Sequence, residues 1–240
     1  MVTGASSGIG EATAKALARA GYAVALAARR EERINELAEE IAGEGGKARA
    51  VPADVADESS ARALIQTAKD ELGALDVLVN NAGVMLLGPI LGADTEEWKR
   101  MVNVNLLGLM YCTHAALPIM QEQGRGHIVN VSSVAGRTAR FGSGVYNATK
   151  WGVGAFSESL RQEGANYNVR VTIVEPGFVD TELQGHNENP MVRDAIEKNR
   201  EQIGKVLEAD DIADAILYAV QRPEHVGINE VLVRPTRQRD

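Results

Sequence analysis

The sequence has little of what several classes of protein require. Cys112 is its only cysteine, so no internal disulfide can form, which suits a reducing compartment such as the cytoplasm. Its four histidines lack the spacing of metal ligands, and we expect no metal site. Basic clusters are absent beyond Arg29 and Arg30, and the net charge is -8, so we expect no nucleic-acid partner. No apolar run is long enough to cross a bilayer and no basic-then-apolar leader is present, which predicts no membrane partner.

What is present points to one α/β domain over residues 1–240. The chain is 45% hydrophobic, and strand-like and helix-like stretches alternate about every thirty residues without repeats or linkers. This predicts a doubly wound parallel sheet of about seven strands with helices on both faces. Only Met1 and Val2 precede Thr3, so the first strand is either unusually short or truncated in this sequence. The other strands are expected at residues 22–26, 47–55, 75–79, 127–133, 168–177 and 226–236.

A glycine-rich turn, TGASSGIG, runs from Thr3 into the first helix. Its glycines are spaced Gly4-x-x-x-Gly8-x-Gly10. Such glycines permit a tight turn and a close approach of backbone to ligand, and the helix that follows offers free N–H groups and a positive dipole to a pyrophosphate. The turn is therefore either a dinucleotide site or a plain change of chain direction.

The second strand runs into Ala28, Arg29 and Arg30. In dinucleotide-binding folds a carboxylate at the end of this strand binds the ribose 2′-hydroxyl, whereas an arginine accommodates a 2′-phosphate. Ala28 stands where the carboxylate would be, which favours NADP(H) over NAD(H). We expect Arg29 to bind the phosphate. Arg30 either joins it or only begins the charged helix over residues 31–46.

Polar or small residues follow the third and fourth strands. The Asp54 carboxylate, beside Val55, could accept from an adenine amino group or begin the next helix, as Asp57 also could. The run NNAG that ends at Gly83 lets a cofactor pass close to the backbone. Asp94 is expected to cap a long helix over residues 94–120. Asn105 inside that helix predicts a helix distortion or a polar role such as holding a water.

Three reactive side chains lie around the fifth strand. Ser133 is expected at the strand's carboxyl end, where open α/β sheets bind ligands. Tyr146 and Lys150 are four residues apart, so they share one face of the next helix. The ammonium is expected to lower the pKa of the phenol so that it can exchange a proton with a substrate oxygen. By itself, a tyrosine and a lysine at this spacing also occur by chance in many helices.

After the sixth strand, which ends in Pro176-Gly177, the polar stretch 182–207 is expected to form a short helical flap over the cleft. His186 within it is interpreted as solvent-exposed rather than as a base. We expect Met85, Leu86, Ala135, Arg137 and Phe141 to line the substrate cleft with this flap, an apolar set with one cation.

Seven of these features stand in order along the chain. They are the turn TGASSGIG from Thr3 to Gly10, Asp54-Val55, the run NNAG from Asn80 to Gly83, Asn105, Ser133, the run YNATK from Tyr146 to Lys150, and Pro176-Gly177. Together they resemble the short-chain dehydrogenase/reductase family, and the resemblance covers nearly the whole chain. A narrower likeness in GVMLLGP, EPGFVDTELQGH and INEVLVRPT is to the subgroup of clavulanic acid dehydrogenase and NADP-dependent 3-hydroxy-acid dehydrogenases.

The resemblance implies a Rossmann-type fold and a role for each matching residue. Tyr146 would be the acid/base, Lys150 would lower its pKa and contact the nicotinamide ribose, Ser133 would position the substrate oxygen, and Asn105 would anchor a proton-relay water. The implied cofactor-binding residues are Gly4, Ser6, Ser7, Gly8 and Ile9 at the phosphates, Asp54 and Val55 at the adenine, Asn81, Ala82 and Gly83 at the ribose, and Pro176, Gly177, Val179 and Thr181 at the nicotinamide. Family members are usually homotetramers or homodimers, and Trp151 and Phe156 would suit the interface, although they could equally pack within one subunit.

The expected function is NADP(H)-dependent oxidation and reduction between a carbonyl and an alcohol of a small molecule. Two alternatives remain at this point. One is a catalytically idle NADP-binding regulator, a type that often lacks the tyrosine or lysine present here. The other is an enzyme that retains its cofactor for epimerisation or dehydration.

Overall fold

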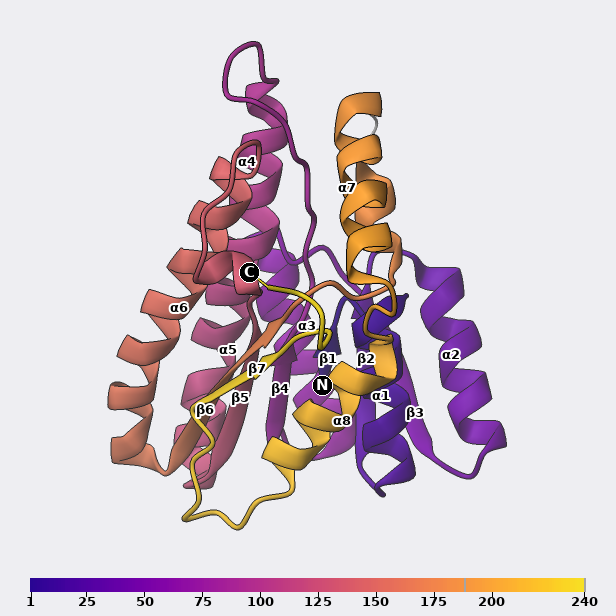
Figure 1. The fold of residues 1–240 in the computed structure, drawn as a ribbon. Coiled ribbons are helices and arrows are strands. Elements are labelled where there is room, and N and C mark those ends of the chain that lie inside the picture. Colours follow the sequence, from indigo (N-terminus) through magenta and orange to yellow (C-terminus); the bar gives the residue numbers. More distant parts are fainter. Residues whose placement is uncertain (188, 240) are drawn as a thin grey trace.

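Seven parallel strands form one sheet in the computed structural model, which describes residues 1–187 and 189–239 (Figure 1). The strand order is β3-β2-β1-β4-β5-β6-β7, so the winding reverses between β1 and β4. At such a reversal the connecting loops part and leave a crevice at the carboxyl ends of the strands. The strands are β1 Val2–Thr3, β2 Ala23–Ala28, β3 Lys47–Pro52, β4 Val77–Asn80, β5 Gly126–Val131, β6 Val169–Pro176 and β7 Glu230–Val233.

Helices cover both faces of the sheet, as the sequence predicts. On one face lie α1 Gly8–Arg19, α2 Glu31–Gly43 and α8 Ala209–Val220, with Leu26 and Val174 in the core beneath them. On the other lie α3 Glu58–Leu72, α5 Gly108–Gln123 and α6 Gly144–Gly164, over Ile128 and Val171. Because the central strands are buried on both faces, they read as continuous apolar runs. The predicted doubly wound fold is confirmed.

Several strands end earlier than the sequence suggests. β3 ends at Pro52 and β5 ends at Val131, so Asp54 and Ser133 lie in the loops beyond the sheet. β1 pairs with both neighbours although it has two residues. Either Asp54 or Asp57 could have begun the next helix. Asp57 does so, since its side chain caps α3 by accepting from the Ser60 N–H.

The long predicted helix is interrupted where Asn105 lies. α4 spans Thr95–Val102, a π-helical segment spans Asn103–Leu107, and α5 follows. Asp94 caps α4, and the predicted distortion around Asn105 is present. By length and composition alone, the continuous helix Thr95–Gln123 could cross a membrane, which was not expected from the sequence. Its inner face, including Cys112 and Met120, packs on α3 and the sheet as a core helix does.

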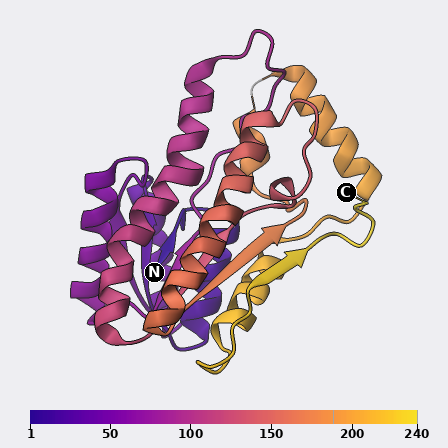
Figure 2. The ribbon, with the colours of Figure 1, turned by 90° about the vertical axis from the view of Figure 1, so that its left-hand side faces the viewer.

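The helices α4 and α7 Pro190–Ile203 rise beyond the carboxyl edge of the sheet in both views (Figure 1, Figure 2). α7 belongs to the predicted flap, which also contains a 3-10 turn over Glu182–His186. Residue 188 of the predicted flap lies outside the described residues. An isolated β-bridge between Val179 and Leu207 pairs the backbone segments at the two ends of the flap.

Candidate active site

A cavity of about 330 Å³ opens at the carboxyl ends of the strands, between the glycine-rich turn and the flap. Every residue predicted from the sequence to bind a cofactor lines it. These are Gly4, Ser6, Ser7, Gly8, Ile9, Arg29, Arg30, Asp54, Val55, Asn81, Ala82, Gly83, Tyr146, Lys150, Pro176, Gly177, Val179 and Thr181. Ser133 also lines the cavity.

The glycine-rich turn lies tightly against its neighbours. Gly8 has a φ of 56°, and a Cβ there would meet the Thr181 Cγ2 at 3.0 Å. A Cβ on Gly10 would lie 2.3 Å from the Gly4 carbonyl oxygen, so no other residue fits without moving the turn. The Asn81 side chain donates to the carbonyls of Thr3 and Gly4, at 3.0 and 3.4 Å. The turn is therefore held from β4 and presents the start of α1 to the cavity.

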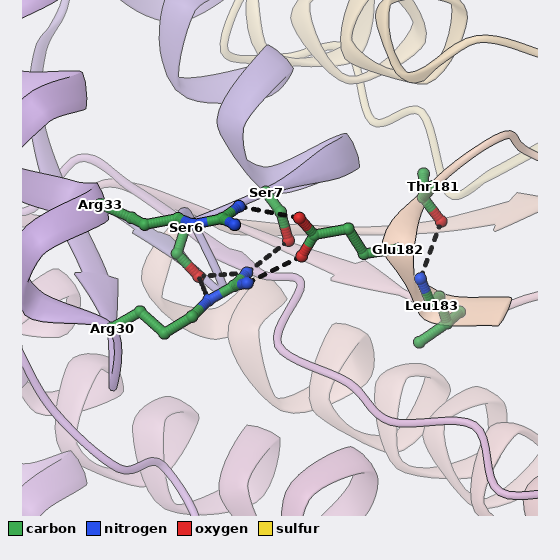
Figure 3. Close-up of polar contacts among 7 residues, drawn as sticks. All are labelled: Ser6, Ser7, Arg30, Arg33, Thr181, Glu182 and Leu183. Carbon is green, nitrogen blue, oxygen red and sulfur yellow. Dashed lines mark hydrogen bonds and ion pairs between the residues drawn. The ribbon is translucent and has the colours of Figure 1, made fainter. Parts of the chain in front are cut away.

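Arg30 contacts the turn directly (Figure 3). Its Nε donates to the Ser6 Oγ at 3.0 Å, and its Nη2 donates to the Ser7 Oγ at 2.7 Å. Its Nη1 donates to the Glu182 carboxylate of the flap at 2.8 Å, and the Arg33 Nη1 binds the other oxygen of Glu182 at the same distance. Arg30 therefore connects the glycine-rich turn to the flap.

Arg29 lies further along the cavity wall. Its Nη1 is 4.0 Å from the Asp54 carboxylate, and its side chain is 58% exposed. Asp54 accepts from the Ala56 N–H at 3.0 Å, which keeps its carboxylate at the rim. Arg30, rather than the expected Arg29, thus has the guanidinium closest to the serine hydroxyls of the turn. Arg30 is also the N-cap residue of α2, so the interpretation that it begins this helix is confirmed.

The catalytic candidates converge at the other end of the cavity. The Ser133 Oγ accepts from the Ala135 N–H at 3.1 Å and donates to the Pro176 carbonyl at 3.5 Å. Tyr146 packs in a small cluster with Val84 and Met101 and is 7% exposed. The Ser133 hydroxyl acts to lower the pKa of the phenol.

Asn147 fixes the loop that carries Ser133 against α6. Its amide donates to the carbonyls of Ala135 and Thr138, at 2.7 and 2.8 Å. Asn147 is 3% exposed. The Ser133 loop and the start of α6, which bears Tyr146, are thereby held in one geometry. This neighbour of Tyr146 was given no role from the sequence, which does not show that its side chain is buried.

Lys150 lies one turn beyond Tyr146, as the spacing predicts. Its Nζ is 5.8 Å from the centre of the tyrosine ring and donates to the Val131 carbonyl at 2.9 Å. Burial lowers the pKa of Lys150 to about 8. Burial also raises the pKa of Tyr146 to about 12, and the Ser133 hydroxyl only partly opposes it. The expected fall in the phenol's pKa is wrong, because burial of the phenol is the largest influence on its pKa and the Lys150 ammonium is directed at a carbonyl.

Asn105 lies behind the cavity wall. Its Oδ1 accepts from the Val84 N–H and its Nδ2 donates to the Val84 carbonyl, both at 2.8 Å. Its Nδ2 also lies 3.3 Å from the Thr149 Oγ1. The side chain thus pins the loop after β4 to α6, and its polar atoms are already in use.

The predicted substrate-cleft residues are only partly placed as expected. Met85, Ala135, Arg137 and Phe141 do not line the cavity, and Leu86 lines a neighbouring one. Phe141 is 94% exposed. Arg137 is ion-paired with Glu175 at 2.6 Å and with Glu230, so its charge is engaged by protein carboxylates.

The flap supplies residues that were not singled out from the sequence. Glu182, Leu183 and Gln184 line the cavity, with Arg100 and Val104 from the long helix. His186 also lines the cavity and is exposed, as the sequence predicts. Burial, and then the charge of Arg100, lower the pKa of His186. Arg33 was also missed, although it lies one helical turn beyond Arg29 and Arg30. No local signal identifies Glu182, because its partners are far away in the chain.

A doubly wound sheet with a glycine turn at its switch point is the architecture of dinucleotide-binding folds, and a Ser–Tyr–Lys group lies at its carboxyl edge. Residues 1–191 match the family described as short chain dehydrogenase. The chain belongs to the short-chain dehydrogenase/reductase family and is an oxidoreductase of that family.

Known proteins resemble the chain over its whole length. It is 42% identical over 236 residues to glycine betaine reductase ATRR of Emericella nidulans, covering 98% of this chain but 18% of that much longer protein. Its structure is similar to the closed form of a serine dehydrogenase complexed with NADP+, with a TM-score of 0.90, 35% identity, and coverage of 99% and 94% of the two chains. It is also similar to an alcohol dehydrogenase of the archaeon Thermococcus sibiricus complexed with 5-hydroxy-NADP, with a TM-score of 0.88, 31% identity, and coverage of 100% and 97%.

Proposed function

We propose that the protein is an NADP(H)-dependent oxidoreductase that interconverts a carbonyl and an alcohol, with Tyr146 as the acid/base. The observation that carries the proposal is that Ser133, Tyr146 and Lys150 share one cavity with a phosphate-binding type of turn and with the Arg30 guanidinium. The names of the relatives, a reductase and two dehydrogenases, support the same chemistry.

The donor set fits a dinucleotide with a 2′-phosphate. The start of α1 and the Ser6 and Ser7 hydroxyls offer donors to phosphate oxygens, and Arg30 and Arg33 offer two planar guanidinium forks. Ala28, at the end of β2, leaves this position without the carboxylate that would favour a ribose hydroxyl. The two solved relatives contain NADP+ and 5-hydroxy-NADP, which supports the same preference.

The nicotinamide ring, when bound, supplies or accepts the hydride. In reduction, the Tyr146 hydroxyl donates its proton to the substrate oxygen, and the Ser133 hydroxyl donates a hydrogen bond to the same oxygen. Ser133 can exchange its long contact with the Pro176 carbonyl for this role. Because burial raises the pKa of Tyr146, its phenol is protonated at neutral pH and carries the proton that reduction of a carbonyl requires.

Lys150 and Asn105 support that proton transfer. With a pKa of about 8, Lys150 is mostly an ammonium at neutral pH, and the Val131 carbonyl fixes its position behind the tyrosine ring. The Asn105 side chain is fully engaged by Val84 and Thr149. A proton-relay water at Asn105 would therefore bind its backbone carbonyl, which the π-helical segment can free from regular pairing.

An NADPH-oxidation screen over aldehydes, ketones and keto acids, run beside NADH, tests the proposal. We expect turnover with NADPH and with at least one class of carbonyl compound, with one NADPH consumed per product. Product formed without net cofactor consumption would indicate epimerisation or dehydration instead. Tight NADPH binding without turnover of any compound would favour the idle regulator. The presence of all four candidate polar groups, Asn105, Ser133, Tyr146 and Lys150, argues against a regulator of this kind.

We also propose a homotetramer or homodimer with α5 and α6 at the interface. Trp151 on α6 is 52% exposed, which supports this assignment. Phe156 packs against the core under α6 and is left out of the proposed interface. Light scattering on the wild type and on Trp151→Ala tests it, with a smaller assembly expected for the variant.

A further inference from the structure

Glu182 bridges two arginines at the phosphate end of the cavity (Figure 3). Its two carboxylate oxygens each accept from a different guanidinium, Arg30 and Arg33, at 2.8 Å. A phosphate group is bound in the same way when it lies between two guanidinium forks. The flap thus places an internal anion on the pair of cations that suits a 2′-phosphate.

The contacts of Arg30 locate this anion relative to the turn. One side of its guanidinium donates to the Ser6 and Ser7 hydroxyls, and the other side donates to Glu182. Arg30 and Glu182 both line the cavity, together with Gly8 and Thr181. Arg30 and Arg33 lower the pKa of Glu182 to about 2, so it is ionised throughout the physiological range.

Resting on the proposed NADP(H) preference, we propose that Glu182 competes with the cofactor 2′-phosphate for Arg30 and Arg33. A carboxylate and a phosphate dianion that bind the same two guanidinium groups repel one another. Binding of the phosphate therefore requires the Glu182 carboxylate to move away from Arg30 and Arg33. Glu182 therefore lowers the affinity for 2′-phosphorylated nucleotides while leaving other adenine nucleotides unaffected.

The displacement also releases one attachment of the flap. Glu182 begins the 3-10 turn of the flap, and Asn187 at its other end accepts from the Leu87 N–H at 2.7 Å. Asp180 at the flap's base pairs with Arg200 of α7 at 2.6 Å. Of these attachments, only that of Glu182 uses the phosphate-binding cations. Binding of the 2′-phosphate is thus linked to the loss of this one attachment of the flap.

Glu182→Gln tests the competition, because glutamine keeps the size of the side chain and removes its charge. The probes are adenosine 2′,5′-bisphosphate and 5′-AMP, which differ only in the 2′-phosphate, with binding measured by calorimetry. The ion pairs are half-exposed, and the expected gain in affinity for the bisphosphate is about fivefold. The 5′-AMP affinity should stay within about twofold.

Asp180→Asn is the matched control. It also removes a carboxylate that pairs with an arginine in the flap, but Arg200 lies on α7 and not at the turn. Its affinity for both probes should equal that of the wild type. Limited trypsin digestion of α7, which carries Arg193, Lys198 and Arg200, gives a second readout. The bisphosphate should speed cleavage in the wild type and have little effect in Glu182→Gln, where the flap is already released.

Three results for the variant would overturn the inference alone. In the first, Glu182→Gln binds the bisphosphate no more tightly than the wild type does. In the second, it gains equally for both probes, which would indicate a general charge effect. In the third, it loses affinity for 5′-AMP, which would make Glu182 a ligand of the ribose. A wild type that does not discriminate between the probes would instead contradict the proposed NADP(H) preference itself, and the inference with it.

Discussion

The two ends of the cavity differ in what determines the pKa values of their side chains. At the catalytic end Tyr146 and Lys150 are 7% and 5% exposed, and burial determines both pKa values, raising that of the phenol and lowering that of the amine. At the phosphate end the side chains of Arg30 and Glu182 are 44% and 47% exposed, and paired charges hold the pKa of Glu182 at about 2. Within one cavity, burial favours neutral groups at one end while ion pairs favour charged groups at the other.

Because of this difference, we expect one end of the cavity to govern turnover and the other to govern which nucleotide binds. The catalytic end is fixed by contacts to backbone, such as Lys150 to Val131 and Asn147 to Ala135, so substitutions there should change turnover. The phosphate end is held by exchangeable, solvent-accessible ion pairs, so substitutions there should change which nucleotide binds.

Tyr146→Phe is expected to have the largest effect. The phenylalanine ring keeps the packing with Val84 and Met101 but has no proton to transfer. Turnover should fall by about a thousandfold, within the range typical of a lost general acid. Binding of NADPH, measured by fluorescence, should change by less than about twofold. A variant with near wild-type turnover would contradict the assignment of Tyr146.

The ionisation of Tyr146 gives the next largest effect. The shift of its pKa from 10.0 to about 12 is a hundredfold change in its acid dissociation constant. The absorbance of phenolate should show no titration of Tyr146 in the ligand-free protein up to about pH 10.5, with Tyr146→Phe as the reference. A titration midpoint well below 10 would show that the Lys150 ammonium outweighs burial, as the sequence alone suggested.

The sign of the linked stability follows from the same shift. Because the folded pKa of Tyr146 is raised, its contribution to the free energy of unfolding is complete below pH 10 and is lost as the pH rises toward 12. Lys150 acts in the opposite direction, since its folded pKa is lowered to about 8, and folding gains as the pH rises from about 8 to 10.5.

Arg30→Ala tests the phosphate end and should have an intermediate effect. Loss of charge-assisted hydrogen bonds predicts a rise of about thirtyfold in the NADPH KM. The NADH KM should change little. Arg29→Ala is the matched control, since Arg29 is a neighbouring arginine whose nearest carboxylate, that of Asp54, is 4.0 Å away. A larger effect from Arg29 than from Arg30 would return the discriminating role to Arg29.

The fold and the cofactor-binding candidates that line the cavity were predictable because their signals are local. The alternation of strands and helices predicts the doubly wound sheet, and short motifs at the strand ends identify the turn, Ser133 and Tyr146. The distortion at Asn105 was also foreseeable, because asparagine disfavours the interior of a helix.

What the sequence could not provide depends on contacts between distant residues. Glu182 and Arg33 are 149 residues apart, and no pattern predicts their ion pair. The rise in the pKa of Tyr146 comes from burial by several elements. The four-residue spacing between Tyr146 and Lys150 identifies only one neighbour of the phenol. Phe141 was expected in the cleft because it is apolar, yet its loop turns outward and exposes 94% of it. Apolar character alone does not determine burial in a loop.

The effect of burial on a pKa can also be tested away from the cavity. His127 lies near the start of β5, at the end of the strand opposite Ser133. His127 is 1% exposed, and its Nε2 lies 2.8 Å from the Thr172 Oγ1. Since that hydroxyl donates to the Ile228 carbonyl at 2.5 Å, the Nε2–H donates to it and the Nδ1 has no partner among the described residues. Burial, and then the charge of Arg170, lower the pKa of His127 to about 3.

Acid should therefore destabilise the fold through His127, and this effect should be smaller than those at Tyr146 and Arg30. Because the folded pKa is lowered from 6.5, the unfolded chain takes up the proton first, and stability present above pH 6.5 is lost as the pH falls toward 3. Between pH 7 and 5.5 the free energy of unfolding should fall by about 1 kcal/mol from this residue, measured by urea denaturation. His127→Gln, which can still donate to Thr172, should remove that dependence, whereas His225→Gln, at an exposed loop position, should retain it. An unchanged dependence in His127→Gln would show that other groups dominate acid unfolding and that burial at β5 does not act as it does at Tyr146.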